Sequence, residues 1–184
     1  MGNVHKETKS RINCNNNSNV NSFNRSKHLV SSRAPVRSLH FLDTFDCFYT
    51  NADCITTKME ELRLYAKNNI PKIIGITEVK PKNFRYSIQN CELAIEHYEM
   101  YSVNLNNEDG RGVSLYIHES IEATQVDIDT DFVESVWVTI RLVSGDKLLV
   151  GCIYRSPNGQ DSNDDSLRKL LTDVVSRDYT VIHY

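Results

Sequence analysis

The sequence predicts an α/β fold in which a mixed sheet, or two packed sheets, is flanked by helices. A strand-like run at residues 41–50, a helical pattern at 55–68 and a dense apolar run at 72–77 form a β–α–β unit. Further along, alternating apolar residues at 136–142 lead through a polar turn to a second apolar run at 147–154, as in an antiparallel hairpin. The mixture of the two kinds of unit favours a layered α/β architecture.

The first helix is predicted from apolar residues that share one helical face. These residues are Ile55, Met59, Leu62 and Ala66, whose spacing of i, i+4, i+7 and i+11 places them on the same side of a helix. Thr57 and Glu60 fit a capping box at the start of this helix. Asn69 and Pro71 are expected to end it, and the apolar run that follows is typical of a buried central strand.

The remaining elements are short. In chain order they are a loop with a short helix at 80–97, a strand at 98–104, a turn at 108–112, strands at 113–118 and 121–128, a helix at 164–176 and a strand-like run at 179–184. We interpret Gly110-Arg111-Gly112 as a tight turn and not as a phosphate-binding loop.

Residues 1–38 are predicted to be a disordered, basic, Asn-rich tail, because the stretch 13–21 is of low complexity with few apolar residues to bury. The tail has seven Lys and Arg residues and one Glu, a net charge of +6, which leaves −9 for the remainder of a chain whose net charge is −3. A basic tail can contact nucleic acid weakly. The acidic remainder, the predicted domain at 39–184, argues against tight non-specific DNA binding.

The composition excludes some classes of protein. No apolar run is long enough to span a bilayer, and the N-terminal region lacks the apolar core of a signal peptide. We therefore expect an intracellular protein without membrane contact, in the nucleus or the cytoplasm. The five cysteines include no Cys-x-x-Cys pair, so reduced thiols are expected and a zinc site is not.

Three strand-like runs end on polar residues suited to phosphate or metal chemistry. Asn51 follows the run 45–50, Glu78 follows 72–77 and Tyr154 follows 148–153. Because the ends of adjacent strands in layered α/β proteins converge on one crevice, these side chains are expected to share a site. A carboxylate, an amide and a phenol so placed indicate metal-assisted chemistry on a phosphate ester.

Each candidate also has a simpler structural interpretation. Asn51 is consistent with a turn residue or a helix cap, and Asp53, just before the helix, is consistent with its N-cap. Tyr154 is consistent with a residue that only packs at a sheet edge. A lone Glu after a strand, such as Glu78, is more often solvated than bound to a metal.

Four short motifs, in order, resemble those of the endonuclease/exonuclease/phosphatase family. They are Thr50-Asn51-Ala52-Asp53, Ile76-Thr77-Glu78-Val79-Lys80, Gly110-Arg111-Gly112-Val113-Ser114-Leu115-Tyr116-Ile117 and Ile153-Tyr154-Arg155-Ser156-Pro157-Asn158. The resemblance is greatest to the apurinic-type endonuclease domain of non-LTR retrotransposons, and it covers residues 43–184. It implies a four-layer α/β sandwich that hydrolyses phosphodiesters of DNA with Mg²⁺ or Mn²⁺.

The resemblance also implies a role for each candidate residue. Glu78 corresponds to the carboxylate that holds the metal, and Asp53 to an acidic residue found near it in some members. Asn51 corresponds to the amide that orients the metal site and the phosphate, and Tyr154 to the tyrosine hydrogen-bonded to the scissile phosphate. Asn158 corresponds to an asparagine that helps to organise the site. Mg²⁺ prefers such oxygen ligands, and a phenol and an amide can both donate to a phosphate oxyanion.

The sequence departs from the family's pattern near its C-terminal end. After the strand that matches 179–182, members continue with Gly-Asp-Phe-Asn or a variant, and later with a Ser-Asp-His-type motif, whereas here Val181-Ile182 is followed by His183-Tyr184. We therefore expect a sandwich that is incomplete at its C-terminus. The resemblance implies that the Asp of the missing Gly-Asp-Phe-Asn motif is the base that activates water. Activity is therefore expected to be largely or wholly lost, because general acid–base catalysis contributes about 10²–10⁴-fold.

Two other functions stay open. The basic tail favours a non-catalytic module that binds nucleic acid or protein. A phosphatase of small or lipid phosphate esters from the same superfamily would share Glu78 and differ in its substrate loops. The sequence does not indicate an oligomeric state.

Overall fold

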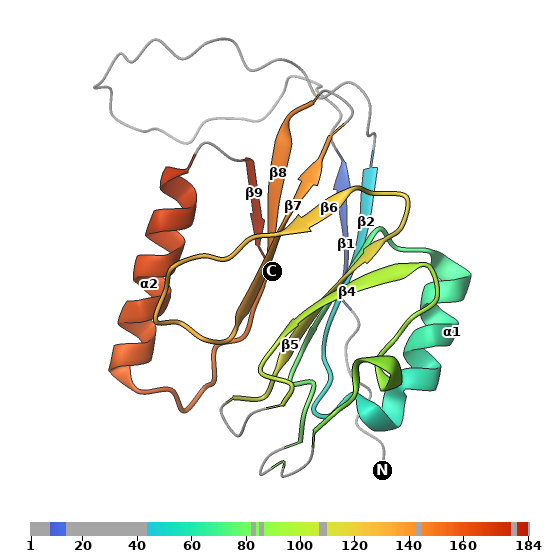
Figure 1. Cartoon of the computed structure of the whole chain (residues 1–184), viewed down its shortest axis with the longest axis horizontal. Coiled ribbons are helices and arrows are strands. Elements are labelled where there is room, and N and C mark those ends of the chain that lie inside the picture. Colours follow the sequence, from blue (N-terminus) through green and yellow to red (C-terminus); the bar gives the residue numbers. More distant parts are fainter. Residues whose placement is uncertain are drawn as a thin grey trace.

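The chain folds into four layers, with two β-sheets face to face between two helices. The computed structural model describes residues 8–13, 44–81, 84, 87–106, 110–142, 145–177 and 180–183. Helix α1 (Met59–Asn69) packs on the outer face of one sheet and α2 (Asp161–Ser176) on the outer face of the other (Figure 1). The predicted four-layer α/β sandwich is confirmed.

The first sheet has β3 at its centre, in the strand order β1-β2-β3-β5-β4. The strands are β1 (Thr8–Asn13), β2 (Thr44–Asn51), β3 (Ile73–Thr77), β4 (Tyr98–Val103) and β5 (Val113–His118). All of β3 is buried, as its apolar run predicted. β3 runs parallel to β2 and antiparallel to β5, so its carboxyl end lies beside the end of β2 and the start of β5.

The second sheet has the order β6-β7-β8-β9. Its strands are β6 (Ala123–Gln125), β7 (Ser135–Arg141), β8 (Lys147–Ile153) and β9 (Thr180–His183). β7 and β8 form the predicted antiparallel hairpin, and β9 runs parallel to β8 after the crossover through α2. β6 is shorter than the strand predicted at 121–128. After Gln125 the chain leaves the sheet, and Val126 and Ile128 pack against the cluster under α2 while the aspartates between and after them are exposed.

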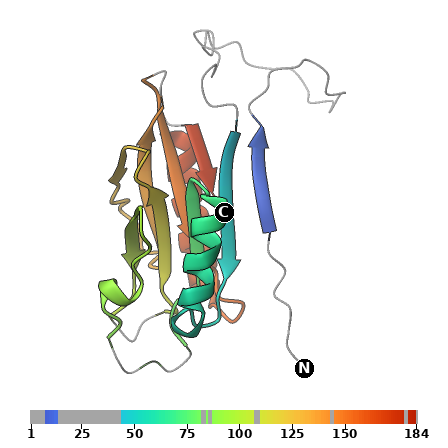
Figure 2. The same cartoon turned by 90° about the vertical axis from the view of Figure 1, so that its right-hand side faces the viewer.

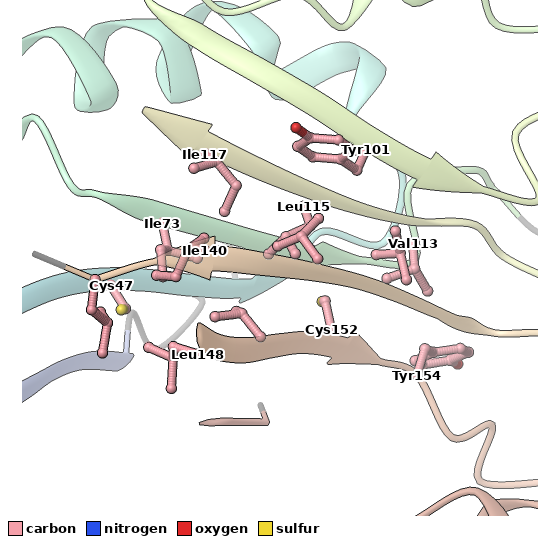
Figure 3. Close-up of a cluster of buried hydrophobic side chains, with 14 residues drawn as sticks. Cys47, Ile73, Tyr101, Val113, Leu115, Ile117, Ile140, Leu148, Cys152 and Tyr154 are labelled. Carbon is pink, nitrogen blue, oxygen red and sulfur yellow. The ribbon is translucent and has the colours of Figure 1, made fainter. Parts of the chain in front are cut away.

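Three apolar clusters fill the three interfaces between the layers. The cluster between the sheets includes Ile73, Leu115 and Ile117 from the first sheet and Ile140, Val150 and Cys152 from the second (Figure 3). The predicted apolar face of α1 packs on the first sheet, and Leu170 and Val174 of α2 pack on the second. Each large side chain buried in this way contributes about 1.5–3 kcal/mol.

Trp137 of β7 covers the backbone of Gly151 on the neighbouring strand β8. A Cβ atom at position 151 would overlap the indole ring. The ring is buried under α2, beside Leu149 and Leu170, and its Nε1 donates to Ser135 Oγ at 3.1 Å. A glycine is therefore required for this close approach, since a larger residue would overpack the layer.

The start of α1 is set by tertiary contacts and not by the predicted capping box. A 3₁₀ turn (Thr56–Lys58) precedes the helix, and Lys58 is its N-cap without a side-chain capping bond. Ile55 N donates to Val79 O at 3.0 Å, and Lys58 Nζ donates to Ala52 O. The loop after β3 therefore fixes where the helix begins, which the local sequence does not reveal.

Residues Thr8–Asn13 form β1, an edge strand antiparallel to β2, inside the stretch predicted to be disordered (Figure 2). For these six residues the prediction of disorder is wrong, because they form a strand. Hydrophobic periodicity could not reveal it, because Ile12 is its one apolar residue, and a polar sequence is typical of an edge strand. Residues 14–43, and with them the predicted boundary at 38/39, lie outside the described residues.

Two of the composition arguments can be compared with the described residues. Within those residues, no helix has the length and apolar character needed to cross a membrane. The described cysteines, Cys47, Cys54, Cys91 and Cys152, are free thiols.

Candidate active site

Asn51, Glu78 and Tyr154 meet at the carboxyl end of β3, where the two sheets approach each other. Asn51 Nδ2 donates to Glu78 Oε1 at 2.9 Å. Tyr154, which follows β8 in the other sheet, donates its hydroxyl to the same oxygen at 2.7 Å. The structure thus brings together three residues that are up to 103 positions apart in the sequence, with one carboxylate at their centre.

A cavity of about 560 Å³ opens at this point. Its lining residues are Asn51, Asp53, Glu78, Arg111, Tyr154, Ser156, Pro157 and Asn158. All five residues singled out in the sequence therefore line one cavity. Glu78 and Tyr154 lie at its less exposed side, whereas Asn51, Asp53 and Asn158 are exposed.

Arg111 is the residue of this cavity that the sequence interpretation missed. Its Nη1 lies 2.9 Å from Glu78 Oε2 and its Nη2 lies 2.6 Å from Asp53 Oδ1. Its Nε donates to the backbone oxygen of Lys80 at 2.7 Å. The side chains of Arg111 and Glu78 are only 12% and 13% exposed, so this ion pair is largely removed from solvent.

The turn that carries Arg111 is the tight turn predicted from its two glycines. Gly110 and Gly112 have φ angles of +68° and +76°, which glycine adopts without a steric penalty. Glu134, just before β7, accepts from Arg111 N at 2.6 Å through Oε1, and its backbone oxygen accepts from Tyr154 N at 2.9 Å. Glu134 therefore positions two residues of the cavity at once. Burial raises the pKa of its carboxyl group, and the backbone hydrogen bonds from Arg111 and Gly112 partly oppose that shift.

The backbone around the cavity holds several residues in the left-handed region. Asp53, Cys54 and Glu78 have φ angles of 42°, 79° and 54°, a conformation that is costly for residues other than glycine. The loops after β2 and β3 stabilise it by pairing with each other, since Cys54 N donates to Glu78 O at 2.8 Å. Such strain is concentrated at functional sites in many proteins.

Asn51 makes the turn contact considered for it and also contacts Glu78. Its Oδ1 accepts from Asp53 N at 3.2 Å, as in an Asx turn, while its Nδ2 donates to Glu78. Asp53 is not the cap of the following helix, because Lys58 is the N-cap of α1 and the Asp53 carboxylate pairs with Arg111.

Tyr154 acts in this site as a hydrogen-bond donor. Burial raises the pKa of its phenol to about 12, and the hydrogen bond that it donates to Glu78 adds to the shift. The hydroxyl therefore keeps its proton at neutral pH and can donate to a carboxylate or to a phosphate oxygen.

The oxygen atoms of the cavity fit a hard divalent cation. Glu78 and Asp53 supply carboxylates, and Asn51 supplies an amide oxygen. Mg²⁺ is usually held by one or two carboxylates, with water and substrate phosphates completing its coordination. In the described part of the chain no cluster of three or more His, Cys, Asp or Glu residues could form a cage for a metal. The oxygen donors are therefore of the kind that fits a Mg²⁺ site completed by water and substrate.

The chain was compared with known proteins by sequence and by structure, and only the structural comparison found similar proteins. A scan against protein-family models gave no match, and a search of the curated proteins gave none either. Among solved structures, the chain is similar to a D. rerio TDP2 humanized by 14 mutations, with 15% identity and a TM-score of 0.52 over 74% of this chain and 62% of that one. It is similar to the AP endonuclease LMAP from Leishmania major, with 11% identity and a TM-score of 0.53 over 68% and 47%.

A third similar structure is the endonuclease domain of TRAS1, a telomere-specific non-LTR retrotransposon. It has 13% identity and a TM-score of 0.51 over 74% of this chain and 57% of that one. The fold is that of the endonuclease/exonuclease/phosphatase superfamily. The chain spans about half to three fifths of the length of these three structures. The predicted resemblance to this superfamily is thus confirmed at the level of the fold.

Proposed function

We propose that this chain carries the metal- and phosphate-binding part of a phosphodiester hydrolase site of the endonuclease type, with DNA as substrate and Mg²⁺ or Mn²⁺ as metal. The observation that supports this proposal is the convergence of Asn51, Glu78 and Tyr154 from three strands on one cavity. The four ordered motifs, and not the distant structural neighbours, favour the retrotransposon type of endonuclease.

Each side chain of the cavity has a role in this proposal. Glu78 and Asp53 would hold the metal, which when bound supplies positive charge that stabilises the phosphoryl oxygens. The Tyr154 hydroxyl and the Asn51 amide would donate to the oxygens of the phosphate, where charge develops in the transition state. Asn158 lies on the same loop as Tyr154 and would contact the substrate from the exposed side.

The cavity lacks a clear general base among the described residues that line it. None of these residues is a histidine, and the two carboxylates, Glu78 and Asp53, are both paired with Arg111. Activation of water by a positioned base contributes about 10²–10⁴-fold in rate. We therefore expect this chain to bind metal and phosphodiester but to hydrolyse slowly.

Nicking of a supercoiled plasmid in Mg²⁺ or Mn²⁺ tests this proposal. Wild type would be compared with Glu78→Ala and with Glu119→Ala, a matched change at an exposed carboxylate that pairs with His97 at the opposite end of the sheet. Slow, metal-dependent nicking that is lost in Glu78→Ala and kept in Glu119→Ala is the expected result.

Three outcomes would contradict the proposed endonuclease. Equal nicking by all three proteins would show that the cleavage does not come from this cavity. Plasmid binding without nicking by a folded protein, unchanged in Glu78→Ala, would favour the non-catalytic interaction module. Release of inorganic phosphate from small esters, in place of nicking, would favour the phosphatase.

A further inference from the structure

The guanidinium of Arg111 connects both carboxylates of the proposed metal site. One terminal nitrogen contacts Glu78 and the other contacts Asp53, at 2.9 and 2.6 Å, while Nε is held by the backbone oxygen of Lys80. Glu78 Oε1 already accepts from Asn51 and Tyr154, so Arg111 occupies the other oxygen of this carboxylate. Both oxygens of the proposed metal ligand are therefore engaged by donors of the chain itself.

A divalent cation at Glu78 would lie beside this positive charge. The repulsion is weakly screened, because Arg111 and Glu78 are both almost nine-tenths buried. An arginine cannot relieve the repulsion by losing its proton at physiological pH. The guanidinium therefore has to move when the cation binds, and the cavity of about 560 Å³ that it lines gives it space to do so.

Two anchors hold the turn of Arg111 while its guanidinium moves. Arg111 N donates to Glu134 at 2.6 Å, and Lys80 N donates to Arg111 O at 2.7 Å. The backbone of the residue is thus fixed on both sides. Displacement then requires rotation of the side chain alone.

We infer that Arg111 is a built-in competitor of the divalent cation: it neutralises Glu78 and Asp53 in the metal-free protein, and the metal binds only by displacing it. This inference rests on the metal site of the proposed function. It makes Arg111 a determinant of metal affinity, because the free energy of breaking its two ion pairs is subtracted from that of metal binding.

Calorimetric titration of the full chain with MnCl₂ at neutral pH tests this inference without measuring activity. The variants are Arg111→Gln, Arg111→Lys, Glu78→Gln and Arg177→Gln. Arg177 is a matched control, since it pairs with Asp173 at 2.6 Å on α2 and lines no part of the cavity. Thermal melting of each variant with and without Mn²⁺ is measured alongside, since a ligand that binds only the folded state raises its stability.

Arg111→Gln is expected to bind Mn²⁺ about 10- to 100-fold more tightly than wild type, because charge-assisted hydrogen bonds no longer compete. Arg111→Lys is expected to lie between the two, since a single ammonium group cannot span both carboxylates. Arg177→Gln should match wild type, and Glu78→Gln should not bind. If Arg111→Gln fails to fold, Arg111→Lys carries the comparison.

The outcomes separate this inference from the proposed function. If Arg111→Gln and Arg111→Lys bind no more tightly than wild type while Glu78→Gln abolishes binding, the metal site stands and the competition is refuted. If Mn²⁺ binds neither to wild type nor to the Arg111 variants in a folded state, the metal site of the proposed function is refuted, and the competition with it.

Discussion

The two ends of β3 carry two hollows of very different character. At the carboxyl end lies the cavity of about 560 Å³ around Glu78. At the amino end lies a larger hollow of about 830 Å³, lined by α1, the segment 94–98 and His118. Size alone would select the second hollow as the functional site, whereas the chemistry selects the first.

The difference lies in how charged groups are held. His97, which lines the larger hollow, pairs with Glu119 at 2.9 Å, but the two side chains are 58% and 64% exposed. Exposed pairs of this kind contribute little. In the smaller cavity, Glu78 and Arg111 are largely buried and come from the loops after β3 and before β5. Glu78 also accepts hydrogen bonds from residues of both sheets. Convergence and desolvation, and not volume, therefore mark a candidate site.

The largest expected effect comes from removing a tyrosine hydroxyl at the carboxyl end of β3, with the same change at the amino end as its control. Tyr154→Phe deletes a donor to Glu78, whereas Tyr98→Phe deletes a donor to Pro71 O at 2.7 Å. Loss of a transition-state donor typically costs about 10²–10³ in kcat, so Tyr154→Phe should reduce the metal-dependent nicking rate by about 100-fold. Tyr98→Phe should leave the rate within about twofold and cost about 1 kcal/mol of stability. Equal rates for both variants would mean that the Tyr154 hydroxyl does not contact the reacting phosphate.

The next effect concerns stability in the absence of metal. Arg111→Gln removes the partner of a buried carboxylate and should cost about 1–3 kcal/mol in urea unfolding. Glu119→Gln at the other end should change the free energy of unfolding by less than about 0.5 kcal/mol. A similar loss in both variants would show that burial does not distinguish the two ion pairs.

A smaller gain of stability is expected at the amino end. Ile70 ends α1 in the left-handed region with φ 48°, and its side chain is mostly exposed. Ile70→Gly removes a conformational cost that is large for a β-branched residue and should add about 1 kcal/mol. In a domain of this size that corresponds to a rise in Tm of about 2–4 °C. An unchanged or lower Tm would show that packing of Ile70 in the larger hollow offsets its strain. No such gain is available at Glu78, whose strain accompanies its role.

The smallest expected difference between the two ends is seen in alkaline solution, where they should behave alike. Burial raises the pKa of Tyr98 and of Tyr154 to about 12, above the value of about 10 for an unfolded chain. Both phenols keep their protons longer in the folded state, so their contribution to stability is complete below pH 10 and is lost between pH 10 and 12. Replacing either with Phe should flatten this fall in urea unfolding between pH 9 and 11.5. A wild-type slope in both variants would contradict the pKa shifts.

The sequence was sufficient to predict the residues at the ends of central strands. Asn51, Glu78 and Tyr154 each follow an apolar run, and such runs locate buried strands whose ends converge. Arg111 could not be predicted in the same way. Its guanidinium reaches Glu78 only because β5 pairs with β3 in an antiparallel register, and a single sequence does not specify that pairing. A cation between two glycines, directly before an apolar strand, was the one available signal.

Elements set by tertiary contacts were the least predictable. Thr57 and Glu60 match a capping box, yet the pairing of Ile55 with Val79 moves the start of α1 to Met59. β1 could not be recognised from periodicity, because Ile12 is its one apolar residue and its place in the sheet comes from backbone pairing with β2. Glu134 belongs to no motif, although it holds both Arg111 and Tyr154 in place.

The placement of Trp137 gives the molecule an intrinsic fluorescent probe of one half only. It is the single tryptophan of the chain, and it is buried between β8 and α2, in a different layer from the cavity. Its emission should follow the separation of α2 from the second sheet, whereas the far-UV circular dichroism signal includes α1 on the first. If the two signals change together in urea, the sandwich unfolds as one cooperative unit. If they change separately, the two halves are distinct units, and the cavity between them is the first part of the molecule to be lost.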